Sequence, residues 1–397
     1  GSGCGMRWIY LPLMVLIGSA SAGSEITLID LSADQRRITL VDREKGQYLG
    51  HVSTCLLEDG RTILAVYPKG HGRGAIIYKK STDGGRTWSD RQPTPESWAT
   101  SQEVPTLHRM QGADGKYRIV LWSGLYPARN SISEDGGKSW SELKRVGDWG
   151  GIVVMGSHLK LTTGRGHYMC VFHDDGRFFS DGGKRARPVT FSLYKTLTTD
   201  GGLSWSHPET LHRDSAVHLC EPGVVRSPDG SQIAMLLREN ARKRNSHIMF
   251  SEDEGKTWSR PRELPVTLTG DRHTCRYAPD GRLVIVFRGR YAAGNVIAAI
   301  DGDCAAWVGQ YEDLVGGRPG QYLLRLLDNK MGHDASYPGV EVLPDDNGSI
   351  VVTTYGHWIR GEDPFILTTR FSMKELDAYA EKGSGLLLEG NSVRVRR

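Results

Sequence analysis

A short motif that occurs four times restricts the fold of this chain more than any other feature. Each copy has Ser or Thr first, Asp third, Gly fifth and Trp eighth. Asp can hydrogen-bond the backbone of its own turn and Gly accepts a positive φ, so the motif predicts a tight hairpin turn whose Trp returns to the core. The copies are STDGGRTW from Ser81, SEDGGKSW from Ser133, TTDGGLSW from Thr198 and SEDEGKTW from Ser251. We therefore expect the four Asp residues to shape turns rather than to catalyse a reaction.

A second repeat surrounds these turns. Apolar, strand-like runs come in pairs joined by turns such as LEDG, GADG, SPDG and APDG, and the pairs continue where the motif stops. The pairs span residues 49–67, 102–122, 151–172, 219–238, 271–288 and 335–355. Six units of this size predict an all-β fold, a six-bladed β-propeller. The segment from Ile26 to Leu40 is expected to supply the outer strand that closes the ring onto the last blade.

In a propeller the first strand of each blade lines the central channel, so the starts of these strands meet on one face. The second strands end in polar or aromatic residues at the same place in most repeats, as in Arg238-Glu239-Asn240 and Arg288-Gly289-Arg290. A polar site on this face is therefore predicted. The first strands are expected to start at His51, Glu103, Met155, Glu221, His273 and Tyr337.

Composition narrows the function classes. The 397 residues carry 50 Lys and Arg against 46 Asp and Glu, a net charge of +4 without a basic run, which gives nucleic-acid binding little support. No cluster typical of a metal site occurs, and we expect neither a metal nor an organic cofactor. The six Cys show no tight spacing, and Cys55, Cys170 and Cys275 lie in apolar stretches where buried free thiols are expected.

The two ends of the chain differ from the rest. Met6-Arg7 leads into an apolar run and then into small residues, a pattern typical of a secretory signal peptide and too short to span a bilayer comfortably. We expect residues 1–23 to be a leader and signal peptide, 24–380 to be one propeller, and 381–397 to be a disordered or appended tail. The mature protein is then expected to be secreted, periplasmic or on the cell surface, without stable membrane insertion, as a monomer or weak dimer.

Two longer segments give a family resemblance. CEPGVVRSPDGSQIAMLLREN and SYPGVEVLPDDNGSIVVTTYG resemble segments of the sialidase (neuraminidase) superfamily, whose turn motif is called the Asp box or BNR repeat. The resemblance covers about Ile26 to Leu376. It implies that Tyr337 attacks the anomeric carbon after Glu221 takes its proton, and that Arg238 binds the substrate carboxylate. A phenol suits this reaction because the carboxylate of a sialic acid would repel a carboxylate nucleophile.

The sequence departs from the family pattern at two places. The family binds the substrate carboxylate with three Arg, but its first, in Arg-Ile-Pro, is replaced by Gly50-His51-Val52-Ser53. The loop YPKGHGRGAIIYKK also lacks the Asp general acid of the family. The candidates for the third Arg of the family are Arg288, Arg272 and Arg318. The candidates for the general acid are His71, Asp174, Asp175 and Glu103. Further substrate contacts are expected from His51, Glu103 and His273.

Each of these roles has a structural alternative. Tyr337 is alternatively a core tyrosine with a satisfied hydroxyl, and Glu221 an ion-pair partner of Arg238. His51 and His273 are alternatively structural hydrogen-bonding groups. Trp122 and Trp358 either stack on sugars or pack in the core.

The resemblance implies an exo-acting glycoside hydrolase, an exo-α-sialidase that releases terminal α-linked sialic acid from sialylated glycans or glycoproteins. Two alternatives remain open. One is a glycosidase or lyase for another acidic sugar, in which His51, His71 and His273 do the acid–base work. The other is a non-catalytic glycan-binding propeller that has lost the acid.

Overall fold

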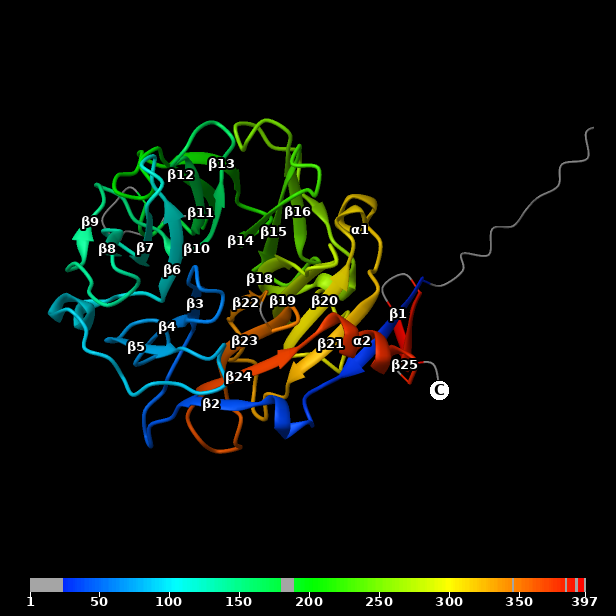
Figure 1. The fold of residues 1–397 in the computed structure, drawn as a ribbon. Coiled ribbons are helices and arrows are strands. Elements are labelled where there is room, and N and C mark those ends of the chain that lie inside the picture. Colours follow the sequence, from blue (N-terminus) through cyan, green and yellow to red (C-terminus); the bar gives the residue numbers. More distant parts are fainter. Residues whose placement is uncertain (1–23, 180–188, 345, 383, 390–391, 396–397) are drawn as a thin grey trace, which may run out of the picture.

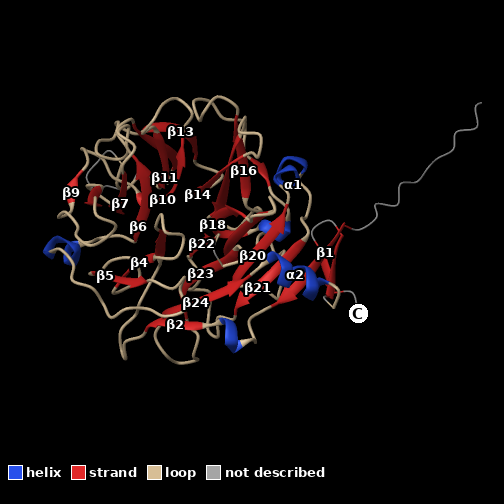
Figure 2. Ribbon diagram, in the orientation of Figure 1, coloured by secondary structure: helices blue, strands red, loops and turns tan. Residues whose placement is uncertain are grey.

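Six β-sheets stand like blades around a central axis in the computed structural model (Figure 1 and Figure 2). The structure describes residues 24–179, 189–344, 346–382, 384–389 and 392–395. The innermost strand of each blade contacts the innermost strands of its two neighbours, which closes the ring. The prediction of an all-β, six-bladed propeller is confirmed.

The chain runs outward from the axis in each of the first four blades. Blade 1 contains β3 (Ser53–Leu56), β4 (Ile63–Pro68) and β5 (Ile76–Ser81). Blade 2 contains β6 (Pro105–Gln111), β7 (Tyr117–Ser123), β8 (Arg129–Ser133) and β9 (Lys144–Arg145). Blade 3 contains β10 (Ile152–Lys160), β11 (Tyr168–Asp174), β12 (Phe191–Thr198) and β13 (Glu209–Asp214). Blade 4 contains β14 (Leu219–Arg226), β15 (Ile233–Glu239), β16 (His247–Ser251) and β17 (Arg262–Glu263).

The last two blades also take strands from the ends of the chain. Blade 5 starts with β18 (Gly270–Tyr277), β19 (Leu283–Gly289), β20 (Cys304–Gly309) and β21 (Tyr322–Leu327). Blade 6 contains β22 (Gly339–Leu343), β23 (Ser349–Gly356), β24 (Phe365–Phe371) and β2 (Thr39–Asp42). The helices are short: α1 (Tyr311–Gly316), α2 (Met373–Ala380) and the single 3-10 turns Gln35–Arg37, Glu96–Thr100 and Val266–Leu268.

The segment expected to close the ring divides its strands between two blades. β2 pairs antiparallel with β24 and closes blade 6, as predicted. β1 (Ser24–Asp30) instead pairs in parallel with β21 of blade 5, so the prediction is wrong for this part. β25 (Ser384–Glu389) pairs with β1, and β26 (Ser392–Val395) pairs with β25, so these parts of the predicted tail form strands. The predicted leader, residues 1–23, lies outside the described residues.

The repeated motif folds as the predicted turn. In the first copy, Asp83 Oδ1 accepts hydrogen bonds from the backbone N–H groups of Arg86 (3.1 Å) and Thr87 (2.9 Å). The Ser81 hydroxyl oxygen accepts from the N–H of Gly85 (2.8 Å), whose φ is +83°. Equivalent contacts recur in the other three copies. These Asp residues hold turns together, as expected.

Apolar side chains fill the spaces between adjacent blades. Trp122 is fully buried, with its ring 6.0 Å from that of Trp149 and 5.0 Å from that of Trp205. Trp358 is 8% exposed, and its Nε1 donates to the carbonyl oxygen of Phe365 (2.8 Å). Both therefore pack rather than stack on a sugar.

The described part of the chain holds five Cys, and all are buried and free, as expected for Cys55, Cys170 and Cys275. Among the residues that the structure describes, no helix is long and apolar enough to cross a membrane.

Candidate active site

The residues that start the inner strands come together at one end of the axis, as the repeat predicts. In five blades the regular pairing of the inner strand with the second strand begins at Ser53, Pro105, Gly223, Thr274 and Gly339. The residues two positions earlier are His51, Glu103, Glu221, Arg272 and Tyr337. Four of these match the predicted starts. In blade 5 the predicted start, His273, is wrong by one residue.

In blade 5 this position lies in a β-bulge after Asp271 and is occupied by Arg272. The bulge shifts the register of β18, and Arg272 within it has a φ of +53°. The side chain of His273 therefore faces away from the site: its Nε2 donates to the carbonyl oxygen of Leu268 (2.7 Å), and its ring stacks on Phe287 at 5.3 Å. The structure gives His273 contacts within the fold and places Arg272 beside the site.

Glu221 is held in a similar bulge of β14. Its φ of +51° is a conformation that costs a residue other than Gly about 1–3 kcal/mol. Its N–H donates to Nδ1 of His173 (3.2 Å), and burial lowers the pKa of His173 to about 3, so that this ring is neutral and can accept. At Gly223, a Cβ would lie 2.1 Å from the carbonyl oxygen of His273, so only Gly at this position leaves room for the backbone of blade 5. Sequence reasoning missed His173.

Tyr337, Glu221 and Arg238 are in direct contact. The Tyr337 hydroxyl donates a hydrogen bond to Glu221 Oε2 and accepts one from Arg238 Nη1 (2.8 Å), which also lies 3.2 Å from Glu221 Oε2. Tyr337 is 5% exposed and Glu221 4%. Burial, and then the charge of Glu221, raises the pKa of Tyr337 well above its ordinary value. The phenol is therefore neutral at rest, and its hydrogen already points at a carboxylate.

A buried carboxylate, Asp271, organises the arginines around this contact. Its oxygens lie 3.2 Å from Arg238 Nε, 2.9 Å from Arg242 Nη2 and 2.8 Å from Arg288 Nε. Burial alone would raise the pKa of Asp271, but the three guanidinium charges outweigh it and hold this pKa far below its ordinary value. Sequence reasoning missed Asp271 and Arg242, because an ion pair between blades leaves no mark in a single sequence.

Arg272 differs from these three arginines because its charge has no partner. It is 9% exposed, and its guanidinium makes no hydrogen bond or ion pair with any residue in the described ranges. It lies 5.9 Å from the centroid of the Tyr337 ring. Burial lowers its pKa, while the charge of Glu221 raises it. A guanidinium stays protonated in proteins, so this site presents a buried cation suited to an external anion.

The comparisons with known proteins agree with the propeller fold. Residues 116–293 match a family model described as a BNR repeat-like domain. A sialidase of Micromonospora viridifaciens is 28% identical over 257 residues, which cover 57% of this chain and 36% of that protein, so the chain spans about a third of that relative. The leech intramolecular trans-sialidase superposes with a TM-score of 0.58 at 16% identity, over 83% of this chain and 69% of that chain. The chain is thus similar to a sialidase in part of its sequence and shares the fold of a trans-sialidase. A protein of unknown function from Dyadobacter fermentans shares the fold, with a TM-score of 0.62 at 17% identity, over 84% and 97% of the two chains.

In this chain, His51 lies where the sialidase pattern has its first Arg. The ring lies 4.7 Å from that of Tyr337, and Nε2 lies 3.2 Å from the Tyr355 hydroxyl. Nδ1 is buried without a hydrogen-bond partner in the described part of the chain. Burial lowers the pKa of His51 well below its ordinary value, so the ring is neutral. His51 therefore cannot replace the charge of the missing Arg.

Two of the four candidate acids, the last residue of β11 and the residue after it, contact the turn that follows this strand. Asp174 accepts hydrogen bonds from the N–H groups of Gly176 (2.7 Å) and Phe178 (3.2 Å). Asp175 forms an ion pair with Arg177 (3.0 Å). These contacts make both carboxylates part of the turn that follows β11.

The other two candidates, Glu103 and His71, interact through their charges with Arg272 and Arg288 respectively. Glu103 Oε1 accepts from the N–H of Val104 (3.0 Å), and burial raises its pKa. His71 lies on the loop after β4, where its Nδ1 is 2.6 Å from the Tyr48 hydroxyl and 3.3 Å from Asp334 Oδ2. Of the four, His71 is the one with a mostly exposed side chain, at 65%.

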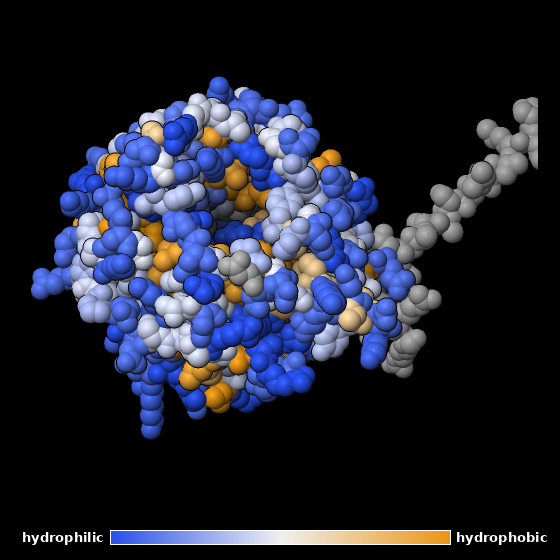
Figure 3. Space-filling model, in the orientation of Figure 1, coloured by the Kyte–Doolittle hydropathy of each residue, from blue (hydrophilic) through white to orange (hydrophobic). Residues whose placement is uncertain are grey.

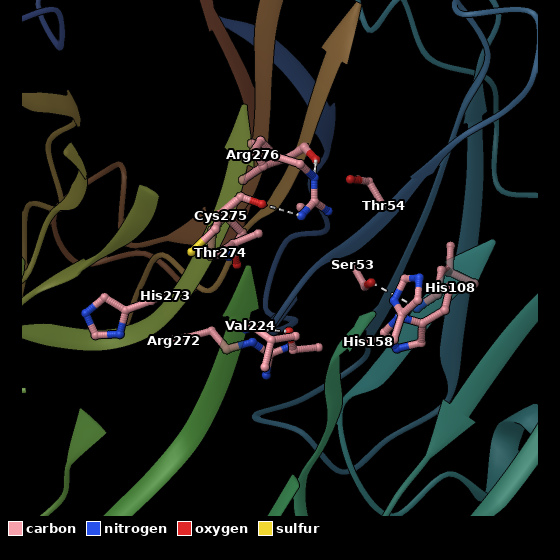
Figure 4. Close-up of a pocket in the computed structure, with 15 residues that line it drawn as sticks. Ser53, Thr54, His108, His158, Val224, Arg272, His273, Thr274, Cys275 and Arg276 are labelled. Atoms are coloured by element: carbon pink, nitrogen blue, oxygen red, sulfur yellow. Dashed lines mark hydrogen bonds between the residues drawn. The ribbon is translucent and has the colours of Figure 1, made fainter. Parts of the chain in front are cut away.

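A cavity of about 270 Å³ continues from Arg272 along the inner strands (Figure 4). Its walls carry the hydroxyls of Ser53, Thr54 and Ser157. Figure 4 shows His108 and His158 on one side and His273 on the other. The molecule is visibly hollowed at the centre of the ring in Figure 3. These polar walls suit water rather than an apolar ligand.

Proposed function

We propose that this protein is an exo-acting glycoside hydrolase that releases terminal α-linked sialic acid from glycans and glycoproteins. The observation that carries the proposal is the buried contact of Tyr337 with Glu221 and Arg238. Neither the fold nor the Asp boxes require a phenol, a carboxylate and a guanidinium to meet at the axis. Relatives in sequence and structure are a sialidase and a trans-sialidase.

The contact provides an activated nucleophile. As the Tyr337 oxygen attacks the anomeric carbon, its proton passes to Glu221 Oε2, to which it is already hydrogen-bonded. The guanidinium of Arg238 donates to the same phenol oxygen and stabilises the negative charge that develops on it. Glu221 alone would be a poorer nucleophile here, because the substrate carboxylate would repel it.

The arginines account for binding of the substrate carboxylate. Arg272 is the cation without an internal partner, so we assign it the main contact. Asp271 already binds part of the guanidinium edges of Arg238 and Arg288. Their remaining donors can add to the contact, but each keeps an internal partner. The substrate carboxylate therefore meets fewer free donors than three uncommitted arginines would present.

The proposal is tested by incubating the purified protein with a glycoprotein that carries α2,3- and α2,6-linked sialic acid. We expect free sialic acid from the parent protein and at least a hundredfold less from Tyr337→Phe and Glu221→Gln. Circular dichroism must show that both variants are folded. Full activity in either folded variant would contradict the assignment, and glycan binding without release would indicate a binding protein.

A second candidate is hydrolysis of another acidic sugar. The observation that favours it is His51, a neutral ring with an unpartnered Nδ1 where the family pattern has Arg. A neutral nitrogen can accept a hydrogen bond from a sugar hydroxyl, which a guanidinium cannot do. A panel of aryl α-glycosides of sialic, deaminated sialic and uronic acids distinguishes the two, because the preferred sugar gives the highest kcat/KM. A product that absorbs in the ultraviolet would indicate a lyase.

Export of the protein is part of the proposal, because sialylated glycans are displayed outside the cytoplasm. It rests on the signal-like pattern within residues 1–23. Expression of the full sequence in a secreting host, with sequencing of the N-terminus of the exported protein, tests it. Retention of the full-length chain inside the cells would contradict export.

A further inference from the structure

The loop that should carry the general acid contains a histidine instead of a carboxylate. His71 lies on this loop, and its Nδ1 contacts the Tyr48 hydroxyl (2.6 Å) and Asp334 Oδ2 (3.3 Å). We propose that His71, positioned by Asp334, donates the proton to the leaving-group oxygen. The inference rests on the proposed function and assigns a role that the Asp of the sialidase pattern would fill.

The orientation of His71 is fixed by groups from two other parts of the chain. Asp334 accepts hydrogen bonds from the Tyr48 hydroxyl at Oδ2 (2.5 Å) and from the Tyr355 hydroxyl at Oδ1 (2.8 Å). Both carboxylate oxygens are therefore occupied, and the carboxylate cannot turn away from the His71 ring. A carboxylate held in this way orients an imidazole and stabilises its protonated form.

Hydrogen-bond counting determines which ring nitrogen points outward. The single hydroxyl hydrogen of Tyr48 is donated to Asp334, so it cannot also be donated to His71. The Tyr48 oxygen must then accept from His71, which places a hydrogen on Nδ1. Nε2 is the ring nitrogen that contacts neither Tyr48 nor Asp334, and the His71 side chain is 65% exposed. Nε2 can give up a proton and later take one from water.

Asp334 also connects the proposed acid to the nucleophile. It lies three residues before Tyr337, so one short segment positions both groups. On the other side, the His51 ring lies between them, with its centroid 5.0 Å from that of His71 and 4.7 Å from that of Tyr337. His71 therefore stands at the rim, one ring away from the attacking oxygen, where a leaving group would exit.

In the proposed reaction every transferred proton has a donor and an acceptor among these residues, the substrate and water. Tyr337 oxygen bonds to the anomeric carbon, and its proton goes to Glu221. The bond from that carbon to the glycosidic oxygen breaks with its electron pair on the oxygen, which takes the proton from His71 Nε2. In the second half, neutral His71 takes a proton from water, whose oxygen attacks the same carbon. Tyr337 leaves and recovers its proton from Glu221.

The charges around His71 support its protonation near neutral pH. The hydrogen bond to Asp334 raises its pKa, burial lowers it, the charge of Glu103 raises it and that of Arg288 lowers it. His51 also faces His71, but stays neutral. Because the acid works in its protonated form, activity is retained below the raised pKa and lost as the pH increases through it. A carboxylic acid donor would lose its proton at lower pH.

Leaving-group dependence tests the role, because an aryl glycoside needs no proton donor whereas a sugar leaving group does. We expect His71→Asn to reduce kcat/KM on 3′-sialyllactose by about 10²–10⁴-fold, the usual contribution of an acid, and by less than about tenfold on the 4-methylumbelliferyl sialoside. Asp334→Asn should move the alkaline limb of the pH profile to lower pH. His212→Asn, on the outer strand of blade 3, is the matched control and should change neither measurement.

Each other outcome overturns the inference. An equal loss on both substrates would make His71 a structural residue. If Glu103→Gln lost activity selectively on 3′-sialyllactose and His71→Asn did not, the general acid would be Glu103 of blade 2. If the folded parent protein hydrolyses neither substrate, the proposed function itself fails. Activity of the parent with no leaving-group effect in His71→Asn rejects only the acid.

Discussion

Asp271 and Arg272 are adjacent in the chain, yet one is bound to three charges and the other to none. Asp271 is fully buried and contacts Arg238, Arg242 and Arg288. Arg272 has no anionic partner in the described part of the chain. The bulge that gives Arg272 its φ of +53° directs the two side chains differently. Three arginines of the site are thus fixed by an internal carboxylate, and the fourth is left for an external anion.

Removal of the Asp271 carboxylate should destabilise the whole propeller. In Asp271→Ala the three arginines lose a shared buried partner, and we expect the free energy of unfolding to fall by about 3–5 kcal/mol. Urea unfolding of the purified proteins measures this. Because the folded-state pKa of Asp271 lies below its unfolded value, the contribution is present above about pH 4 and is lost only in stronger acid. A loss below about 1 kcal/mol would mean that the arginines reach water without Asp271.

Removal of the Arg272 charge should have the opposite effect on stability. A buried cation without a partner costs solvation energy, so Arg272→Met should unfold at the same or a higher temperature, while release of sialic acid falls at least tenfold. Arg276→Met is the matched control. Arg276 donates to the carbonyl oxygens of Val340 (3.1 Å) and Cys275 (2.8 Å), and its loss should cost about 1 kcal/mol. Equal destabilisation in both variants would show that Arg272 has a partner in the folded protein.

Most of the fold follows from the sequence because each blade repeats the same local signals. The turn residues recur with Trp at a fixed position, and the paired apolar runs recur six times. The strand β1 could not be placed in the same way. Its apolar alternation predicts a strand, but its partner in blade 5 lies nearly 300 residues away, with Thr27 opposite Tyr322. Pattern alone does not select between two open sheet edges.

The site could be predicted where a residue type and a repeat position agree. Tyr337 and Glu221 lie two residues before the regular pairing of their inner strands begins, in Tyr-Pro-Gly and Glu-Pro-Gly, and the structure brings them into contact. Asp271, His173 and Asp334 could not be found, because each acts through a contact between blades or loops. The bulge in β18 could not be predicted from the sequence either, because it changes the register without a change in residue type.

The Asp boxes should affect stability without affecting catalysis. Asp135 accepts hydrogen bonds from the Ser139 N–H (2.9 Å) and the Ser133 hydroxyl (2.9 Å), and bonds from Ser139 outweigh burial to lower its pKa to about 2. Asp135→Ala should lose about 1–2 kcal/mol of unfolding free energy with unchanged kcat. Because the pKa of Asp135 is lowered in the folded protein, the difference in unfolding free energy between parent and variant should be largest at pH 7. It should shrink as the pH falls below about 4. A tenfold change in kcat would contradict a purely structural turn.

The channel histidines should make the protein sensitive to mild acid. His158 Nδ1 lies 2.5 Å from His108 Nδ1, so one of the two nitrogens must lack a hydrogen, and burial lowers the pKa of His158 to about 3. As the pH falls below about 6.5, the unfolded chain binds a proton at His158 that the folded protein refuses. This group alone should then reduce the free energy of unfolding by about 1.4 kcal/mol for each pH unit. Urea unfolding at pH 7, 6 and 5 should show that the free energy of unfolding declines with falling pH. In His158→Asn the decline should be less steep, by the contribution of about one bound proton. Equally steep declines in the two proteins would mean that His158 is already protonated in the folded protein. The facing Nδ1 of His108 would then have to move away.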